Sequence, residues 1–182
     1  MNIWHDFDPR KIKKDDFYAI IEIVDGSKKK YELDKETGIL KLDRILYTST
    51  HYPANYGFIP KTYADDDDPL DVLVLCKERL DPMVMVHCYP IGVIRMEDSN
   101  QVDDKIIAVP FDDPNFNCYT EADELPPHVL DEIRHFFKVY KELEHEKHTS
   151  LSNALPRKFA EEMIQRSIED YAKEFGADYG SC

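Results

Sequence analysis

The chain has 182 residues, of which 37 are acidic and 23 are basic, so its formal net charge is −14 at pH 7. Its hydrophobic residues (42%) and aromatic residues (12%) are enough for one globular domain with a sizeable core. The acidic charge argues against general nucleic-acid binding, and the lack of an apolar run of ~20 residues argues against a membrane-spanning helix.

The first two thirds of the chain have the pattern of short β-strands separated by turns. We predict strands at residues 16–24, 29–34, 39–46, 72–76, 84–96 and 105–111. Asp25, Gly26 and Ser27 indicate a hairpin turn after the first strand, and Pro90 and Gly92 interrupt the fifth. Short strands with frequent turns are typical of an antiparallel barrel or sandwich.

Residues 48–63 follow neither a strand period nor a helix period, yet they contain Tyr52, Tyr56 and Phe58. We expect an ordered, irregular segment with a functional role. In the last third, apolar residues recur at spacings of three and four, which predict helices at about 127–147 and 155–176. The sequence therefore predicts an α+β fold, mainly β, with residues 1–182 in a single domain.

Residues 65–68 are consecutive aspartates, followed by Pro69 and then by Asp71. A solvated acidic turn is the ordinary interpretation of such a run. Asp71, however, stands at the start of an apolar strand, where a carboxylate without a cation is costly. Clustered carboxylates at this position favour a hard divalent cation such as Mg²⁺ or Mn²⁺.

Charged residues also recur two positions apart, a spacing that places side chains on one face of an extended chain. Arg44 lies among leucines by strand alternation, so it requires an anion, either a structural carboxylate or a phosphate. Each feature alone fits an ordinary polar surface, but together they indicate a site for a metal-bound phosphate ester or anhydride. The charged pairs are Lys30 with Glu32, Asp66 with Asp68, and Asp103 with Lys105.

With these motifs the chain resembles the family I soluble inorganic pyrophosphatases. The specific match is the segment Asp66-Asp67-Asp68-Pro69-Leu70-Asp71-Val72, and the resemblance covers about residues 17–144. The supporting motifs, in the family's order, are Lys30-Tyr31-Glu32, Asp43-Arg44, Tyr52-Pro53-Ala54-Asn55-Tyr56-Gly57-Phe58, Asp98 with Asp103-Asp104-Lys105, and His135-Phe136-Phe137 before Tyr140-Lys141.

Residue by residue, the resemblance implies a metal-binding group, a substrate-binding group and one general base. Asp68 would be the base that accepts the proton of a water or hydroxide held between metal ions, and Glu22 and Tyr52 would support the site. The implied metal ligands are Asp66, Asp71, Asp98, Asp103 and, through water, Glu32. The implied phosphate ligands are Lys30, Arg44 and Tyr56 on one side, and Lys105, Tyr140 and Lys141 on the other.

The resemblance also implies a small, OB-like, five-stranded closed barrel with flanking C-terminal helices. The implied activity is Mg²⁺-dependent hydrolysis of inorganic pyrophosphate, bound as its magnesium complex, to two orthophosphates. Several Mg²⁺ ions would bind per site, and Mn²⁺ or another divalent ion would substitute. We expect a homo-oligomer, preferably a hexamer, with no nucleic-acid or membrane partner. The four scattered cysteines indicate a reducing, cytoplasmic compartment.

Two other classes of function remain open at this stage. An acidic module that only buffers divalent cations would explain the aspartates, but it has no use for Arg44 and several lysines in the same site. An OB-like oligonucleotide binder would stack bases on Tyr52 and Tyr56, but the charge of −14 opposes it. A hydrolase of another phosphoanhydride is a nearer rival, although the sequence indicates no base-recognition pocket.

Overall fold

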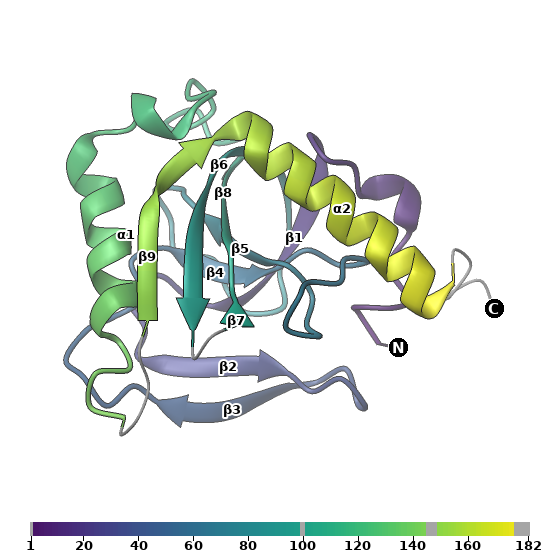
Figure 1. The fold of residues 1–182 in the computed structure, drawn as a ribbon, viewed down its shortest axis with the longest axis horizontal. Helices are drawn as coiled ribbons and strands as arrows, with labels where there is room; N and C mark the ends of the chain where they lie inside the picture. The colour runs from purple at the N-terminus through teal and green to yellow at the C-terminus, as the bar shows by residue number, and fades with distance from the viewer. Residues whose placement is uncertain (1, 99–100, 145–148, 177–182) are drawn as a thin grey trace.

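The computed structural model describes residues 2–98, 101–144 and 149–176. Strands β1 to β8 precede both α-helices in the chain, and only β9 lies between α1 and α2 (Figure 1). In chain order the elements are η1 (Pro9–Lys11), β1 (Phe17–Ile23), β2 (Lys29–Leu33), β3 (Leu40–Ile45), β4 (Asn55–Phe58), β5 (Asp71–Val74), β6 (Met85–Asp98), β7 (Gln101–Val102), β8 (Lys105–Pro110), η2 (Ala122–Glu124), α1 (Pro127–Val139), β9 (Thr149–Pro156) and α2 (Arg157–Phe175).

Five strands close into a ring in the order β1-β4-β5-β8-β6, because β6 pairs back onto β1. The predicted five-stranded barrel with flanking helices is therefore confirmed. One expectation needs correction, since β5 and β8 run parallel while the other pairs in the ring are antiparallel. The long strand β6 lies between β5 and β8 in sequence and carries the chain back, so both of these strands run in the same direction.

Alternate residues of the barrel strands pack into two different apolar clusters. In β5, Leu73 belongs to the cluster that includes Phe136 and Phe137 of α1, whereas Val72 and Val74 belong to the cluster that includes Ile164 of α2. A strand that is buried on both faces has a continuous apolar sequence rather than an alternating one. The strands thus present apolar side chains on two faces, and α1 packs against one of the two clusters while α2 packs against the other.

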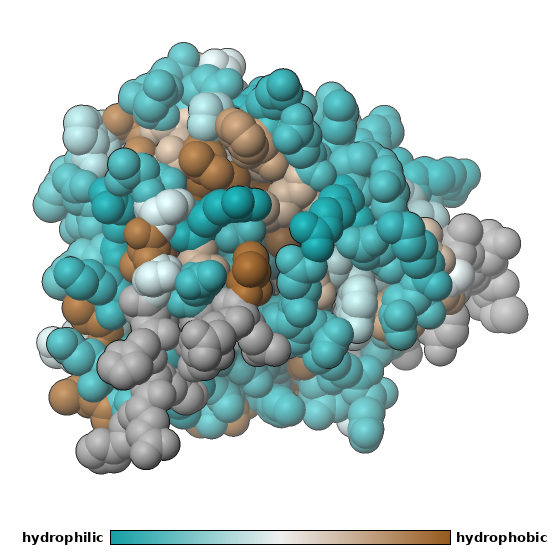
Figure 2. Space-filling view, viewed as in Figure 1, coloured by the Kyte–Doolittle hydropathy of each residue, from teal (hydrophilic) through white to brown (hydrophobic). Residues whose placement is uncertain are grey.

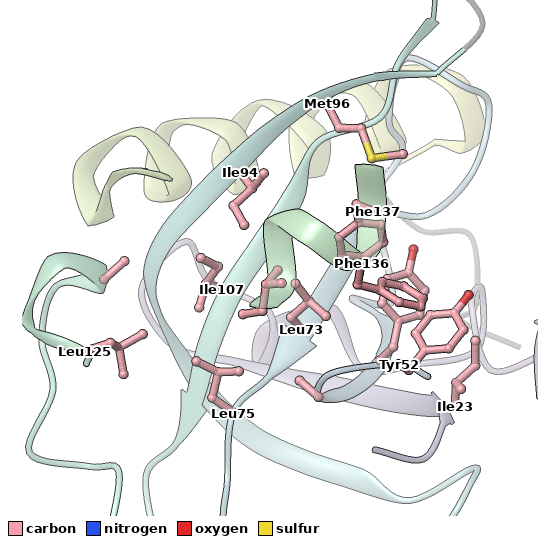
Figure 3. Close-up of a cluster of buried hydrophobic side chains, with 14 of the residues drawn as sticks. Ile23, Tyr52, Leu73, Leu75, Ile94, Met96, Ile107, Leu125, Phe136 and Phe137 are labelled. Carbon is pink, nitrogen blue, oxygen red and sulfur yellow. The ribbon is translucent and has the colours of Figure 1, made fainter. Parts of the chain in front are cut away.

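The cluster against α1 carries aromatic rings toward the region of the predicted site. Figure 3 shows Phe136 and Phe137 beside Tyr52, with Leu75 and Leu125 toward the other end of the cluster. The ring centroids of Tyr52 and Phe136 are 4.7 Å apart, a normal packing distance for aromatic pairs. Hydrophobic packing thus fixes the segment around Tyr52, which has no regular secondary structure.

Strand β4 corrects the prediction that residues 48–63 are irregular. Its residues are all buried, and Gly57 lies opposite Ile21 in the pairing of β1 with β4. Because β4 is short and both its faces are covered, it shows no period that sequence patterning can detect. A β-carbon added to Gly57 would lie 1.8 Å from the carbonyl oxygen of Ile20, so only glycine fits at this crossing.

Replacing Gly57 with alanine should therefore destabilise the barrel by roughly 3 kcal/mol or more, because backbone atoms must move to relieve the clash. The free energy of unfolding in urea measures this loss. Gly176→Ala is a useful control, since no atom lies within 4 Å of a β-carbon there and only the positive φ of 83° is unfavourable. We expect the control to lose about 1 kcal/mol; equal losses in both variants would contradict the clash.

Several element boundaries also differ from those predicted. Gly26 does form a turn, but β2 pairs with β3 in a separate hairpin and not with β1. Strand β6 continues past Pro90 through a register shift rather than ending there. Strand β9, which pairs with β6, was not predicted.

The first predicted helix is shorter than its apolar spacing indicated. Helix α1 ends at Val139, and the amides of Glu142 and Glu144 bond three residues back, to Val139 and Lys141. Residues 145–147 of the predicted helix lie outside the described residues. The second helix, predicted at 155–176, is confirmed as α2, and it buries Ala160, Ile164, Ser167 and Tyr171.

The surface agrees with the high content of charged residues, which make up 33% of the chain. The face shown in Figure 2 is mostly hydrophilic, with hydrophobic side chains in small groups between polar ones. Within the described part of the chain, no helix is both long and apolar enough to cross a membrane.

Candidate active site

A cleft of about 510 Å³ lies between the β2–β3 hairpin, the aspartate-rich loop before β5 and the segment that follows α1. Most of the residues singled out from the sequence line it, although they come from distant parts of the chain. Those residues are Glu22, Lys30, Glu32, Tyr52, Tyr56, Asp66, Asp68, Asp71, Asp103, Lys105, Tyr140 and Lys141. Arg44 is not among the lining residues, and Asp98 ends β6 with its side chain outside the described part.

Local hydrogen bonds fold the aspartate-rich loop back on itself. The amide of Ala64 donates to the carbonyl of Asp68 at 2.8 Å, and Asp67 has a φ of 66°, which reverses the chain between them. The amide of Leu70 then donates to the buried Thr62 hydroxyl at 2.9 Å as the chain enters β5. An aspartate tolerates the left-handed conformation better than most residues. The loop therefore presents Asp66 and Asp68 to the cleft next to Asp71.

Lys105 is the centre of a buried polar cluster. Its ammonium donates to Oδ2 of Asp71 and to Oδ1 of Asp103, and its side chain is only 3% exposed. The Tyr56 hydroxyl donates to the same Oδ2 of Asp71 at 2.5 Å. Burial by itself lowers the pKa of Lys105, but Asp103 and Asp71 outweigh it and hold that pKa well above its usual value. The cation thus stays charged and holds two carboxylates together.

The carboxylates of the cleft repel one another in the absence of further cations. Burial, followed by the charges of Asp71, Asp103 and Asp68, raises the pKa of Asp66 to about 7. Burial and the charge of Asp71 likewise raise the pKa of Glu22 to about 8, although Glu22 accepts a hydrogen bond from the Leu33 amide at 2.8 Å. The single positive charge of Lys105 does not neutralise this group.

The donor set fits a hard divalent cation. Asp66, Asp71 and Asp103 supply carboxylate oxygens in one cleft, and a raised pKa at Asp66 marks a place where added positive charge is favourable. In the described residues, no three His, Cys, Asp or Glu side chains already form a complete metal-binding group. Here Asp71 and Asp103 accept from Lys105 instead.

The hairpin wall of the cleft carries Lys30 and Glu32. As their spacing predicted, the two side chains lie on one face of β2, and Lys30 Nζ donates to Glu32 Oε1. Lys30 also reaches Asp43 Oδ2 on β3 at 3.3 Å. Tyr140 and Lys141 also line the cleft, and they directly follow α1, so the early end of that helix places both there.

Arg44 has a structural partner that the sequence did not reveal. Its Nε donates to Glu144 Oε1 at 2.7 Å, and its guanidinium also pairs with Asp43. The leucines that share the face of Arg44 by alternation differ in burial, since Leu42 is 54% exposed and Leu46 is 2% exposed. The contacts favour the structural-carboxylate interpretation, and the assignment of Arg44 to substrate stays a prediction.

Several cleft residues were not singled out from the sequence. They lie at the N-terminus, in the turn after β2 or at the start of β3, and neither a period nor a motif distinguishes them: Trp4, Asp34, Lys35, Glu36 and Lys41. Only the folding of the hairpin toward the aspartate-rich loop places them in the site.

The raised pKa of Glu22 predicts a pH-dependent stability in metal-free protein. Its folded pKa of about 8 exceeds the usual 4.5, so the folded state binds more protons and stability falls as pH rises between these values. Glu22→Gln keeps an acceptor for the Leu33 amide. We expect the stability of this variant, measured relative to the unmodified protein, to be higher at pH 8 than at pH 5. Thermal unfolding in EDTA at both pH values tests this. A difference that does not change with pH would contradict it.

Comparisons with known proteins identify the family. The family model described as inorganic pyrophosphatase matches residues 19–172. Soluble inorganic pyrophosphatase 1 of Arabidopsis thaliana is 48% identical over 170 residues, which cover 93% of this chain and 80% of that protein.

Solved structures agree with this match. An inorganic pyrophosphatase of Helicobacter pylori superposes with a TM-score of 0.85 and 40% identity, over 87% of this chain and 95% of that one. An inorganic pyrophosphatase of Thermus thermophilus gives a TM-score of 0.89 and 36% identity, over 94% and 99%. Sequence and fold therefore agree along nearly the whole chain, and it belongs to the inorganic pyrophosphatase family.

Proposed function

We propose that the chain hydrolyses inorganic pyrophosphate to two orthophosphates in this cleft, with Mg²⁺ as its cofactor. The observation that carries the proposal is that one cleft combines two kinds of charge. Its carboxylates suit hard cations, and Lys30, Lys105 and Lys141 suit phosphate oxygens. Membership of the inorganic pyrophosphatase family supports the same substrate.

Asp66, Asp71 and Asp103 would hold the Mg²⁺ ions, and Asp98 and Glu32 would contribute to further ions that arrive with the substrate. When bound, the cations would make an attacking water more acidic and would neutralise phosphate charge. Lys105 and Tyr56 hold Asp71 in place through hydrogen bonds, so these two residues orient a proposed metal ligand. Glu22 supports the hairpin wall by accepting the Leu33 amide.

Asp68 is our proposed general base. Its side chain is 48% exposed and lines the cleft, so it can reach a water molecule near the bound phosphate. An ionised carboxylate that accepts a proton during attack contributes typically 10²–10⁴-fold to rate. Asp66, in contrast, has a pKa raised by burial and by the charges of Asp71, Asp103 and Asp68, so added positive charge is favourable there, as it is at a metal ligand.

The two phosphates of the substrate would contact lysine and tyrosine side chains of the cleft. Lys30 and Tyr56 would bind one phosphate, and Lys105, Tyr140 and Lys141 the other. Arg44 would join the first group only if it leaves its partners Asp43 and Glu144. Tyr52 is 2% exposed and packs on Phe136, which supports a role in shaping the cleft.

The first experiment is phosphate release from pyrophosphate by the purified chain, in Mg²⁺ and in excess EDTA. ATP and a simple phosphomonoester serve as parallel substrates. We expect fast release from pyrophosphate alone, abolished by EDTA. Release mainly from ATP would favour another phosphoanhydride hydrolase, and no release from folded protein with Mg²⁺ or Mn²⁺ would favour a cation-binding module.

We further propose a cytoplasmic homo-oligomer, preferably a hexamer, built from one domain over residues 1–182. Large apolar side chains on and beside β3 support self-association, because Ile39, Leu42 and Tyr47 are 66%, 54% and 62% exposed. Sedimentation velocity of the full chain distinguishes a hexamer from smaller species.

A further inference from the structure

A lysine in the β2–β3 turn reaches the aspartate-rich loop from the opposite wall of the cleft. Lys35 Nζ donates to the carbonyl oxygen of Asp67 at 3.0 Å and forms an ion pair with Asp68 Oδ1. Both contacts fall on the part of the loop that carries our proposed general base. Lys35 belongs to neither the motifs nor the charge pairs identified in the sequence.

The turn that carries Lys35 is fixed by its own hydrogen bonds. Asp34 Oδ1 accepts from the Thr37 amide at 2.9 Å and from the Thr37 hydroxyl at 2.7 Å, while the Gly38 amide donates to the Asp34 carbonyl at 2.8 Å. The side-chain amide of Asn2 donates to the carbonyl of Lys35 at 2.6 Å. The backbone of Lys35 is therefore held both by the hairpin and by the N-terminal segment.

The side chain of Lys35 is also directed by Trp4. Its ammonium lies 5.8 Å from the centre of the indole ring, which favours a cation at that place. Trp4 is itself fixed, because it is 3% exposed and its indole nitrogen donates to the Thr62 carbonyl at 2.9 Å. The Lys35 ammonium therefore contacts the aspartate-rich loop from a position that Trp4 supports.

The aspartate-rich loop has other side-chain contacts, but these hold residues other than Asp68. Tyr63 OH donates to Asp67 Oδ1 at 2.5 Å, and Arg166 forms an ion pair with Asp65. Neither of these contacts reaches the carboxylate of Asp68. In the described residues, Lys35 is the cation that contacts it within ion-pair distance.

We infer that Lys35 is a positioning residue, which orients the Asp68 carboxylate for proton transfer by holding it from across the cleft. The inference rests on the proposed function of Asp68. It assigns no stabilising role to the pair, because both side chains are nearly half exposed and such pairs contribute little to folding. Lys35 would therefore act on turnover rather than on stability.

The test measures kcat and KM for pyrophosphate in saturating Mg²⁺, together with the unfolding midpoint. We expect Lys35→Met to lower kcat by about tenfold, with KM and the unfolding midpoint nearly unchanged. Lys35→Arg keeps the charge and should recover part of kcat. Lys29→Met is the matched control, because Lys29 lies on the same hairpin, over Tyr31 at 5.9 Å, and does not line the cleft.

A double-mutant cycle shows whether Lys35 acts through Asp68. If it does, adding Lys35→Met to Asp68→Asn should change kcat by less than about twofold. A full tenfold loss in that background, or a raised KM in the single variant, would mean that Lys35 contacts substrate directly and would overturn the inference. Unchanged kcat in Lys35→Met would overturn it as well. If the unmodified chain releases no phosphate from pyrophosphate, the proposed function fails too; an active chain confines the failure to Lys35.

Discussion

Asp68→Asn should reduce pyrophosphate turnover by at least about 100-fold, because asparagine cannot accept the proton of the attacking water. The fold should be unaffected, since the Asp68 side chain is 48% exposed and the loop is held mainly by backbone contacts such as that of Ala64 with Asp68. Steady-state phosphate release measures turnover, and thermal unfolding in Mg²⁺ shows whether cation binding is retained.

Asp65→Asn is the matched control for this substitution. Asp65 belongs to the same aspartate run, but its carboxylate pairs with Arg166 of α2 and does not line the cleft. We expect it to keep turnover within about twofold of the unmodified chain, because exposed pairs contribute little. Near-normal turnover in Asp68→Asn would remove Asp68 from the role of base. Equal losses in both variants would point to the overall charge of the loop instead.

Lys105→Met should strongly destabilise the metal-free protein. The substitution removes the ammonium that donates to both Asp71 and Asp103. The Lys105 side chain is only 3% exposed, so water cannot easily replace it. Removing one partner of a buried ion pair costs roughly 3–5 kcal/mol. We therefore expect a loss of that size in the free energy of unfolding at pH 8 in EDTA, and a smaller loss in saturating Mg²⁺, which would supply the missing positive charge.

Urea unfolding in the two buffers measures both losses, and turnover of the same variant should also fall because a proposed phosphate ligand is removed. Lys158→Met serves as the control, since its pair with Glu162 on α2 spans 3.9 Å and its side chain is 81% exposed. This control should change stability by less than about 0.5 kcal/mol in either buffer. If Mg²⁺ leaves the loss in Lys105→Met unchanged, then the carboxylates around Lys105 do not take up the cation.

The sequence by itself determined the parts of this protein that depend on local patterns. Strands β1, β2, β3, β5 and β8 and helix α2 lie close to where their apolar periods predicted them, because each period reflects which faces of that element are buried. The spacing of Lys30 with Glu32 and of Asp103 with Lys105 correctly predicted side chains on one face, since alternation in an extended chain depends only on neighbouring residues.

Only the tertiary structure decided which distant residues meet. Strand β4 forms because Gly57 allows it to cross β1 closely, and β9 forms because β6 offers an edge, so neither has a clear period of its own. Arg44 pairs with Glu144, which lies 100 positions away in the sequence, and Lys35 pairs with Asp68 across the cleft. These contacts depend on how the barrel closes and how the hairpin folds over it, which are long-range properties that no local pattern records.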